Sequence, residues 1–196
     1  MRPTNRVVIL RTERLMVRTA TLADAELYYV LWTSPSVMGF VGFPRGLPIS
    51  RREIRQQLRQ PHTSQLGRPL VAELLASGEA IGECHMSELD EDDVVEPDVK
   101  LLPSFWGHKY GVELWRAMVA YLFLHTACVA VQGTPNIQNI ASIKMQEATG
   151  ATRVGEGVFE FPAKMSGYTT PVPYYTYRLT RQDWEHTQPG RLAKKL

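Results

Sequence analysis

The pattern of apolar and polar positions predicts a chain built mainly of short strands. Apolar and polar residues alternate over residues 14–19, which is typical of a strand with one buried face. Two further strands are predicted on either side of a Ser77-Gly78-Glu79 turn, and Pro103 ends a third. Together with valine-rich or closing segments later in the chain, the predicted strands cover residues 14–19, 70–76, 80–89, 94–102, 128–132, 153–160 and 174–180.

Helix signals separate these strands. Residues 21–24 open a first helix that Ser34-Pro35 ends, and Ser50 with Glu53 has the spacing of a capping box. Asn139 and Gly150 have the residue types expected at the two ends of a late helix. A longer helix in between has a broad apolar face made of Leu114, Ala117, Met118, Tyr121 and Leu122.

The order of these elements predicts the fold class. Strands and helices follow one another as β-α-α-β-β-β-α-β-α-β-β, which favours an α/β protein with a mixed sheet flanked by helices. A chain of 196 residues has room for one such domain, and we expect residues 185–196 to form a loose C-terminal tail.

Composition and charge exclude several classes of protein. Charged residues make up 21% of the chain and hydrophobic residues 44%, which is ordinary for a globular protein. The net charge of +2 is too small to indicate a nucleic-acid partner. Arg51, Arg55 and Arg59 are spaced along one helix face and could bind phosphate, but we expect a solvated face.

The cysteines, histidines and apolar runs point to a cytoplasmic protein. Cys84 and Cys128 lie in apolar stretches, so we expect buried free thiols and no disulfide framework. The five histidines have no metal-ligand spacing, so no metal is expected. The apolar run at 7–10 is too short for a signal peptide, and the run at 117–131 is too short to span a membrane.

One segment predicts an anion site. Over residues 103–113, a strand ends, a turn with two glycines follows, and the long amphipathic helix begins. The first amides of a helix have no partner within the helix, and the positive end of its dipole attracts anions. Glycine lets a ligand approach the backbone closely. Phosphate binding at this junction is therefore one open interpretation.

Several segments, in order and spacing, resemble the GNAT superfamily of acyl-CoA-dependent N-acetyltransferases, and within it the RimJ/RimL-like branch. The most informative is Phe105-Trp-Gly-His-Lys-Tyr-Gly111 followed by Glu113, which is similar to the pyrophosphate loop of that branch. The other similar segments lie at residues 12–18, 34–40, 80–83, 139–150 and 177–184. The resemblance implies a single-domain GNAT fold over residues 1–196.

The same resemblance implies acetyl-CoA as co-substrate. Main-chain groups of the strand that ends at Leu101 and Leu102 would meet the pantetheine arm and the acetyl carbonyl. Asn139 would bind the cofactor side or simply cap its helix, and both roles stay open. The loop amides implied to hold the pyrophosphate belong to Gly107, His108, Lys109, Tyr110, Gly111 and Val112.

The resemblance also implies catalytic residues for acetyl transfer to a primary amine. Glu96 matches a position that supplies the general base in some members, and Asp98 is the next candidate; both could instead belong to the solvated acidic run at 88–98. Ser142 matches a serine proposed to protonate the departing thiolate, or is an ordinary polar residue of a first helical turn. Cys84 is expected to be a core thiol and not an acyl-carrying nucleophile.

Two departures from the family pattern leave a second function open. Lys109 stands where a glycine is usual, and Gln146 stands where many members carry a tyrosine as general acid. A non-catalytic acyl-CoA-binding module is therefore the alternative to an enzyme. For the enzyme, the acceptor would be a protein N-terminus or a small amine, and we expect a monomer or homodimer without nucleic-acid or membrane partners.

Overall fold

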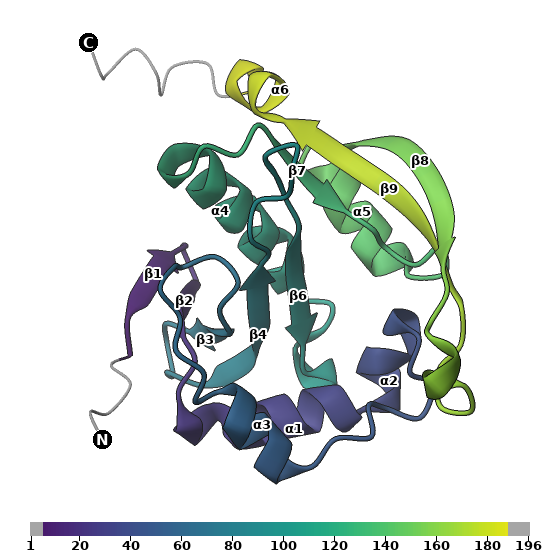
Figure 1. Cartoon of the computed structure of the whole chain (residues 1–196). Helices are drawn as coiled ribbons and strands as arrows, with labels where there is room; N and C mark the ends of the chain where they lie inside the picture. The colour runs from purple at the N-terminus through teal and green to yellow at the C-terminus, as the bar shows by residue number, and fades with distance from the viewer. Residues whose placement is uncertain (1–5, 188–196) are drawn as a thin grey trace.

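The computed structural model describes residues 6–187, and its first sheet contains five strands. Every neighbouring pair in this sheet is antiparallel. Figure 1 shows the sheet in the left half of the molecule. In spatial order the strands are β1 (Val8–Arg11), β2 (Leu15–Thr19), β3 (Leu70–Leu74), β4 (Ala80–Met86) and β6 (Pro97–Leu101).

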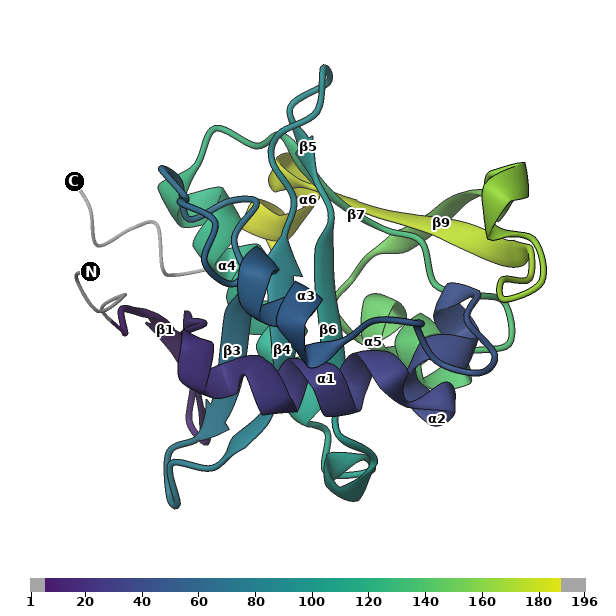
Figure 2. The same cartoon turned by 60° about the horizontal axis from the view of Figure 1, so that its bottom comes forward.

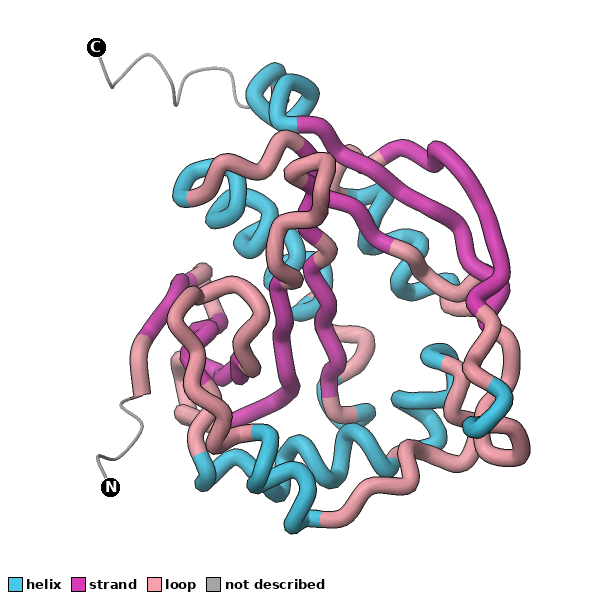
Figure 3. Tube along the Cα trace, viewed as in Figure 1, coloured by secondary structure: helices cyan, strands magenta, loops and turns pink. Residues whose placement is uncertain are grey.

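The second sheet contains four strands and is mixed. Its first pair is parallel and the other two pairs are antiparallel. Figures 1 and 3 show this sheet turning away from the first toward the upper right. In spatial order the strands are β5 (Val94–Val95), β7 (Ala130–Gly133), β9 (Val172–Thr180) and β8 (Thr152–Phe159).

Helices cover both faces of the first sheet. Figure 2 shows α1 crossing in front of β3, β4 and β6, with α4 behind them. The α-helices are α1 (Ala25–Thr33), α2 (Pro35–Met38), α3 (Arg51–Gln57), α4 (Tyr110–His125), α5 (Ile140–Ala148) and α6 (Arg181–His186). Short 3₁₀ turns lie at η1 (Leu22–Asp24), η2 (Gly39–Val41), η3 (Pro103–Phe105) and η4 (Ala163–Met165).

The main core lies between the sheets and α4. Of the predicted apolar face of α4, Leu114, Met118 and Leu122 are fully inaccessible in this core, whereas Ala117 and Tyr121 are half-buried at its edge. A smaller core on the opposite face packs α1 and α3 against Val71. The expected α/β architecture with mixed sheets flanked by helices is therefore confirmed, and both cysteines are buried free thiols as predicted.

The strand predicted at 94–102 is interrupted, and this is the main correction. The chain leaves the second sheet after β5 and enters the first sheet at β6. Glu96 lies at the crossing, where its N–H donates to Ser87 Oγ at 2.9 Å and its carbonyl accepts from Ser87 N–H at 3.1 Å. Pro97, which follows, has no N–H to donate to a ladder. The two halves of one predicted strand therefore serve two sheets.

The helix boundaries agree closely with the sequence signals. Ser50 and Glu53 form the capping box, the Asn139 side chain accepts from Ser142 N–H, and Gly150 has a positive φ of 90°. Arg51 is exposed and pairs with Glu26, as expected of a solvated face. In the part of the chain from residue 6 to residue 187, no helix is both long and apolar enough to span a membrane.

Both ends of the described chain differ from the prediction. The apolar run near the start forms β1, which the alternation rule did not predict because the run is only four residues long. The strand predicted at 174–180 ends at Thr180 as expected, but α6 was not predicted: the Thr180 side chain accepts from Asp183 N–H and begins this helix. Residues 185 and 186 complete α6, and 188–196 of the expected tail lies outside the described residues.

A buried group of charges joins β2, β3 and the start of the first helix. Arg18, 5% exposed in its side chain, donates to Asp24 through two nitrogens at 2.9 and 2.7 Å and to Glu73 at 2.8 Å. Burial alone would raise the pKa of Asp24 and of Glu73, but the hydrogen bonds and charge of Arg18 outweigh it and lower both. Both carboxylates therefore depend on the charge of Arg18, and Glu73 also pairs with Arg6.

We expect Arg18→Met to destabilise the fold severely, because the buried Asp24 loses the cation that it pairs with and Glu73 keeps only its pair with the exposed Arg6. The loss in free energy of unfolding should be about 3–5 kcal/mol at neutral pH, measured by urea titration. Since both folded pKa values are lowered, the contribution exists above the unfolded pKa values and disappears as the pH falls through the folded ones. The exposed pair provides the control: Arg51→Met should change stability little, and equal losses in both variants would contradict this assignment.

Candidate active site

The site is organised by two neighbouring parallel strands that separate. β5 pairs with β7 only through Val94 with Ala130 and Val95 with Val131. Beyond these pairs the chain continues as β6, which bonds to β4, while β7 bonds to β9 on its other side. Figures 1 and 3 show β6 and β7 diverging toward their carboxyl ends. The facing edges of β6 and β7 are therefore left without each other as partners.

The register of β6 shows which main-chain groups face this divergence. Leu102 N–H donates to the Ile81 carbonyl at 2.9 Å, and bonding positions alternate along an antiparallel pair. Val99 and Leu101 therefore direct their N–H and C=O groups away from β4. Leu101 already uses its carbonyl to accept from Trp106 Nε1 at 2.9 Å. The Leu102 carbonyl accepts from Phe105 N–H, so Leu102 has no free main-chain group.

The loop from β6 to α4 presents an uncapped helix start. Gly107 has φ +80° with open space where a Cβ would be, and Lys109 has φ +64° as the N-cap residue. A left-handed lysine is uncommon, because a Cβ disfavours this conformation. The Lys109 side chain makes no capping hydrogen bond, so the first amides of α4 stay available. Gly107, His108 and Lys109 are all exposed.

Glu113 fastens the start of α4 to the β1–β2 turn. Its carboxylate accepts from Thr12 Oγ1 at 2.5 Å, Arg14 N–H at 3.0 Å and Arg14 Nε at 2.7 Å. Arg14 in turn lies over the Tyr110 ring and donates to the His108 carbonyl at 3.2 Å. Partial burial would raise the pKa of Glu113, but these hydrogen bonds and the Arg14 charge lower it. The conformation of the loop is therefore fixed from outside the helix.

The start of α5 lies near the end of β7. Asn139 caps the helix by accepting from Ser142 N–H at 3.1 Å, which is one of the two roles left open for it. Gln146, 3% exposed, packs its amide on Gly133, where an added Cβ would lie 2.2 Å from Nε2. Ser142 is one helical turn before Gln146 on the same face. This places Ser142 toward the diverging end of β7.

Glu96 belongs to a chain of hydrogen bonds that crosses three strands. Gln132 on β7 donates from Nε2 to Glu96 Oε1 at 2.6 Å. Arg178 on β9 donates from Nη2 to Gln132 Oε1 at 2.6 Å. All three side chains are half-buried. They lie on the sheet face opposite α4, because their neighbours Val131 and Leu179 point into the α4 core.

Asp98 has different partners from Glu96. Its carboxylate forms an ion pair with Lys100, which also pairs with the buried Glu83 at 3.2 Å. Trp32 on α1 donates to the same oxygen of Glu83 at 2.8 Å. Loss of hydration would raise the pKa of Asp98, but the Lys100 charge lowers it, while burial raises the pKa of Glu83. Asp98 and Glu83 therefore share one ammonium group.

The family model of the acetyltransferase (GNAT) domain matches residues 14–152 of the chain. This protein belongs to the GNAT acetyltransferase family. The predicted enzyme class, an N-acetyltransferase, and the predicted GNAT fold are thereby confirmed.

Solved structures share the fold of this GNAT enzyme at low identity. A GNAT acetyltransferase from Bacillus anthracis is 18% identical, with a TM-score of 0.72 over 90% of this chain and 99% of its own. Spermidine N-acetyltransferase from Vibrio cholerae, solved with CoA and spermine, is 16% identical, with a TM-score of 0.73 over 89% and 99%. AAC(6′)-Ib with ribostamycin and coenzyme A is 22% identical, with a TM-score of 0.71 over 91% and 99%. No curated protein matches the sequence.

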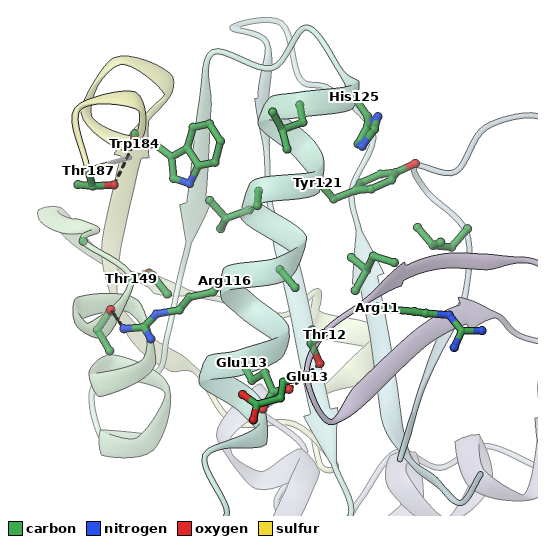
Figure 4. A pocket seen from close by; sticks show the side chains of 18 of the residues that line it. Arg11, Thr12, Glu13, Glu113, Arg116, Tyr121, His125, Thr149, Trp184 and Thr187 are labelled. Carbon is green, nitrogen blue, oxygen red and sulfur yellow. Dashed lines mark hydrogen bonds between the residues drawn. The ribbon is translucent and has the colours of Figure 1, made fainter. Parts of the chain in front are cut away.

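A groove of about 1060 Å³ lies elsewhere on the GNAT domain, along the outer side of α4. Figure 4 shows Tyr121 and His125 of α4 on one wall, with Arg11 of β1 beside them and Trp184 of α6 opposite. Arg116 reaches across its floor and donates to the Ala148 carbonyl at the end of α5. None of the predicted site residues lines this groove.

The predicted residues of the GNAT enzyme are gathered from separate elements around the β6–β7 divergence. Glu96 precedes β6, Leu101 ends it, and the 107–112 loop leads from it into α4. Asn139 and Ser142 approach from the start of α5. The sequence did not single out Gln132 or Arg178, because isolated polar residues in a strand have no spacing signal; only the three-dimensional contacts connect them to Glu96.

Glu113→Gln should loosen the loop at the start of α4. The neutral amide loses the charge that Arg14 and Thr12 bind, so the free energy of unfolding should fall by about 1 kcal/mol at neutral pH. Because the folded pKa is lowered, this contribution exists above the unfolded pKa and disappears as the pH falls through the folded one. Urea titrations of parent and variant should therefore converge in acid; a gap that is constant with pH would argue against an ionic anchor.

Proposed function

We propose that this GNAT enzyme transfers an acetyl group directly from acetyl-CoA to a primary amine. The observation that carries the proposal is the juxtaposition of the β6–β7 divergence with an uncapped, glycine-containing start of α4. The diverging strands offer main-chain groups to an extended arm, and the helix start offers amides to a diphosphate. The CoA-bound structures of the spermidine and aminoglycoside acetyltransferases support the same donor.

The 107–112 loop would hold the pyrophosphate. The uncapped amides of Tyr110, Gly111 and Val112 point out of the helix start, and Gly107 leaves open space for a ligand to approach the backbone. The exposed Lys109 ammonium would add a positive charge beside them. His108 and Trp106 would border the ligand, while the free Leu101 N–H would meet the pantetheine arm.

Glu96 is the proposed general base. The acceptor arrives largely as an ammonium ion, since an α-amino group has a pKa near 7.7–8.0 and a lysine-like amine one near 10.4. Glu96 would take one proton, so that the neutral nitrogen attacks the thioester carbonyl. A new C–N bond forms, the C–S bond breaks, and the second nitrogen proton passes to solvent. Glu96 then releases its proton to solvent before the next turnover. Asp98 is the weaker candidate because its carboxylate is held by Lys100.

Ser142 is the proposed acid for the leaving group. The departing thiolate takes the hydroxyl proton, and the serine recovers a proton from solvent, so the protons balance. The position of Ser142 one turn before Gln146 supports this role. Gln146 has no ionisable proton and so cannot replace the tyrosine that many family members carry there.

Membership of the GNAT family favours an acceptor that carries a primary amine. The related structures are named for amine acceptors, spermidine and aminoglycosides. The RimJ/RimL-like segments favour a protein N-terminus or a small amine. We propose a cytoplasmic enzyme that acts as a monomer or homodimer.

Glu96→Gln should lower kcat by roughly 10²–10⁴ at neutral pH while CoA affinity is nearly unchanged, because only the proton acceptor is lost. Higher pH should restore part of the rate, as more of the amine is then neutral. Thiol release from acetyl-CoA is measured with a short peptide bearing a free N-terminus, spermidine and kanamycin as acceptors.

Ser142→Ala is the companion variant in the same assay. It should also lower kcat, without recovery at high pH, because the missing proton serves the leaving group. Parental kcat in Glu96→Gln across the pH range would show that the base lies elsewhere. CoA binding to the parent without turnover of any amine would favour a non-catalytic module.

Lys109→Asn should weaken CoA binding about three- to fivefold at low salt, since it removes an exposed charge. Asparagine tolerates the left-handed conformation that Lys109 adopts, so backbone strain is not increased. Calorimetric titration at low and high ionic strength should show the difference shrinking with salt. Tighter binding by Lys109→Gly than by the parent would instead mean that the lysine side chain crowds the diphosphate.

A further inference from the structure

We propose that Gln132 positions the carboxylate of Glu96 for proton transfer, and that Arg178 fixes the orientation of Gln132. The inference rests on the proposed role of Glu96 as general base. It adds two positioning residues, neither of which belongs to the loops expected to bind acetyl-CoA.

The contacts join two strands to the crossing between β5 and β6. Glu96 follows β5, Gln132 lies in β7 and Arg178 lies in β9. β7 and β9 are bonded neighbours, with Gln132 directly opposite Arg178. The hydrogen bonds from Gln132 to Glu96 and from Arg178 to Gln132 are both 2.6 Å long. The neutral amide of Gln132 therefore lies between a carboxylate and a guanidinium group.

The direction of each hydrogen bond follows from the chemistry of its ends. An arginine guanidinium has only donors, and an ionised carboxylate has only acceptors. An amide held between them has one stable orientation, with Oε1 toward Arg178 and Nε2 toward Glu96. If the amide were flipped, its NH₂ group would face the Arg178 donors and its oxygen would face the Glu96 carboxylate, so neither hydrogen bond could form. Arg178 therefore decides which end of Gln132 meets Glu96.

This arrangement fixes one carboxylate oxygen and leaves the other available. Gln132 occupies Glu96 Oε1, and within residues 6–187 no other side-chain hydrogen bond to this carboxylate is observed. Oε2 can then face an incoming ammonium ion. An oriented acceptor is worth more than a mobile one, because the rotamer entropy of the side chain is lost before the reaction.

A neutral amide is suited to this task. Lys100 holds Asp98 with a full positive charge, which favours the ionised carboxylate and weakens it as a base. Gln132 orients Glu96 through a dipole and keeps the Arg178 charge one side chain further away. The carboxylate is thus held without a cation in contact.

Two substitutions of Gln132 test the proposal through the pH dependence of kcat/KM. Gln132→Met keeps an unbranched side chain and removes the hydrogen bond, so kcat should fall about tenfold, a typical order for a lost charge-assisted bond. Gln132→Glu puts a second carboxylate against Glu96. Two carboxylates in contact cannot both ionise easily, so the acidic limb of the profile should move up by more than about one pH unit.

The experiment uses the full chain, acetyl-CoA and whichever panel amine the parent turns over fastest. Gln182→Met, an exposed glutamine on α6, is the matched control and should retain the parental profile. CoA affinity and thermal unfolding are measured for each variant, because a purely structural role would change stability without moving the acidic limb.

The possible outcomes distinguish the positioning role of Gln132 from the proposed role of Glu96 as general base. An unmoved acidic limb in Gln132→Glu overturns the positioning role. Near-parental kcat in Gln132→Met overturns it as well, and this second result decides the question if the glutamate variant does not fold. Parental kcat in Glu96→Gln overturns the base itself, whatever Gln132 does. Loss of rate in Glu96→Gln, combined with a displaced limb in Gln132→Glu and a lowered kcat in Gln132→Met, supports both.

Discussion

The site depends on the separation of β6 from β7, which leaves the edges that face each other unpaired. Each strand has two edges, and β6 bonds to β4 while β7 bonds to β9. Their shared ladder is limited to the two residue pairs of β5. Unpaired backbone groups away from water are costly, so edges that diverge inside a fold need another partner. Along β6, Trp106 supplies one donor to Leu101, and an extended ligand would supply others.

The crossing at Glu96 makes this divergence possible. Ser87 accepts from and donates to the main chain of Glu96, which holds the crossing against β4 while Val95 stays in the second sheet. The same crossing sets the direction of the Glu96 side chain toward Gln132. A local irregularity of the backbone therefore decides both where the sheets part and where a carboxylate is presented.

Local signals in the sequence predicted most elements of the fold. Capping residues such as Ser50 and Asn139 act within one helical turn, so their positions mark helix starts directly. The interruption at Glu96 could not be predicted in this way, because residues 94–102 are continuously compatible with a strand. Which sheet each half joins is decided by β4 and β7, which are distant in sequence. The propensities of residues 94–102 contain no information about pairing with these distant strands.

In the candidate site, too, local features could be predicted from the sequence and contacts between distant segments could not. The 107–113 loop was found from sequence because glycines and a helix start occur together in a short span. The hydrogen bonds from Thr12 and Arg14 that anchor this loop could not be predicted, because about a hundred residues separate them from Glu113 in the sequence. Gln132 and Arg178 could not be predicted for a related reason. Each is a single polar residue in a strand, and only the pairing of β7 with β9 brings them together beside Glu96.

Three carboxylates near β4 and β6 show how environment separates side chains of one chemistry. Glu83 is buried, pairs with Lys100 and accepts a hydrogen bond from Trp32 Nε1, so its partners lie within the fold. Asp98 lies next to the same lysine and is held ionised by it. Glu96 alone of the three is bound by a neutral amide. A base must be ionised yet able to accept a proton, and a carboxylate already paired with a cation meets the second condition poorly. The partner of each carboxylate therefore assigns the proposed role to Glu96.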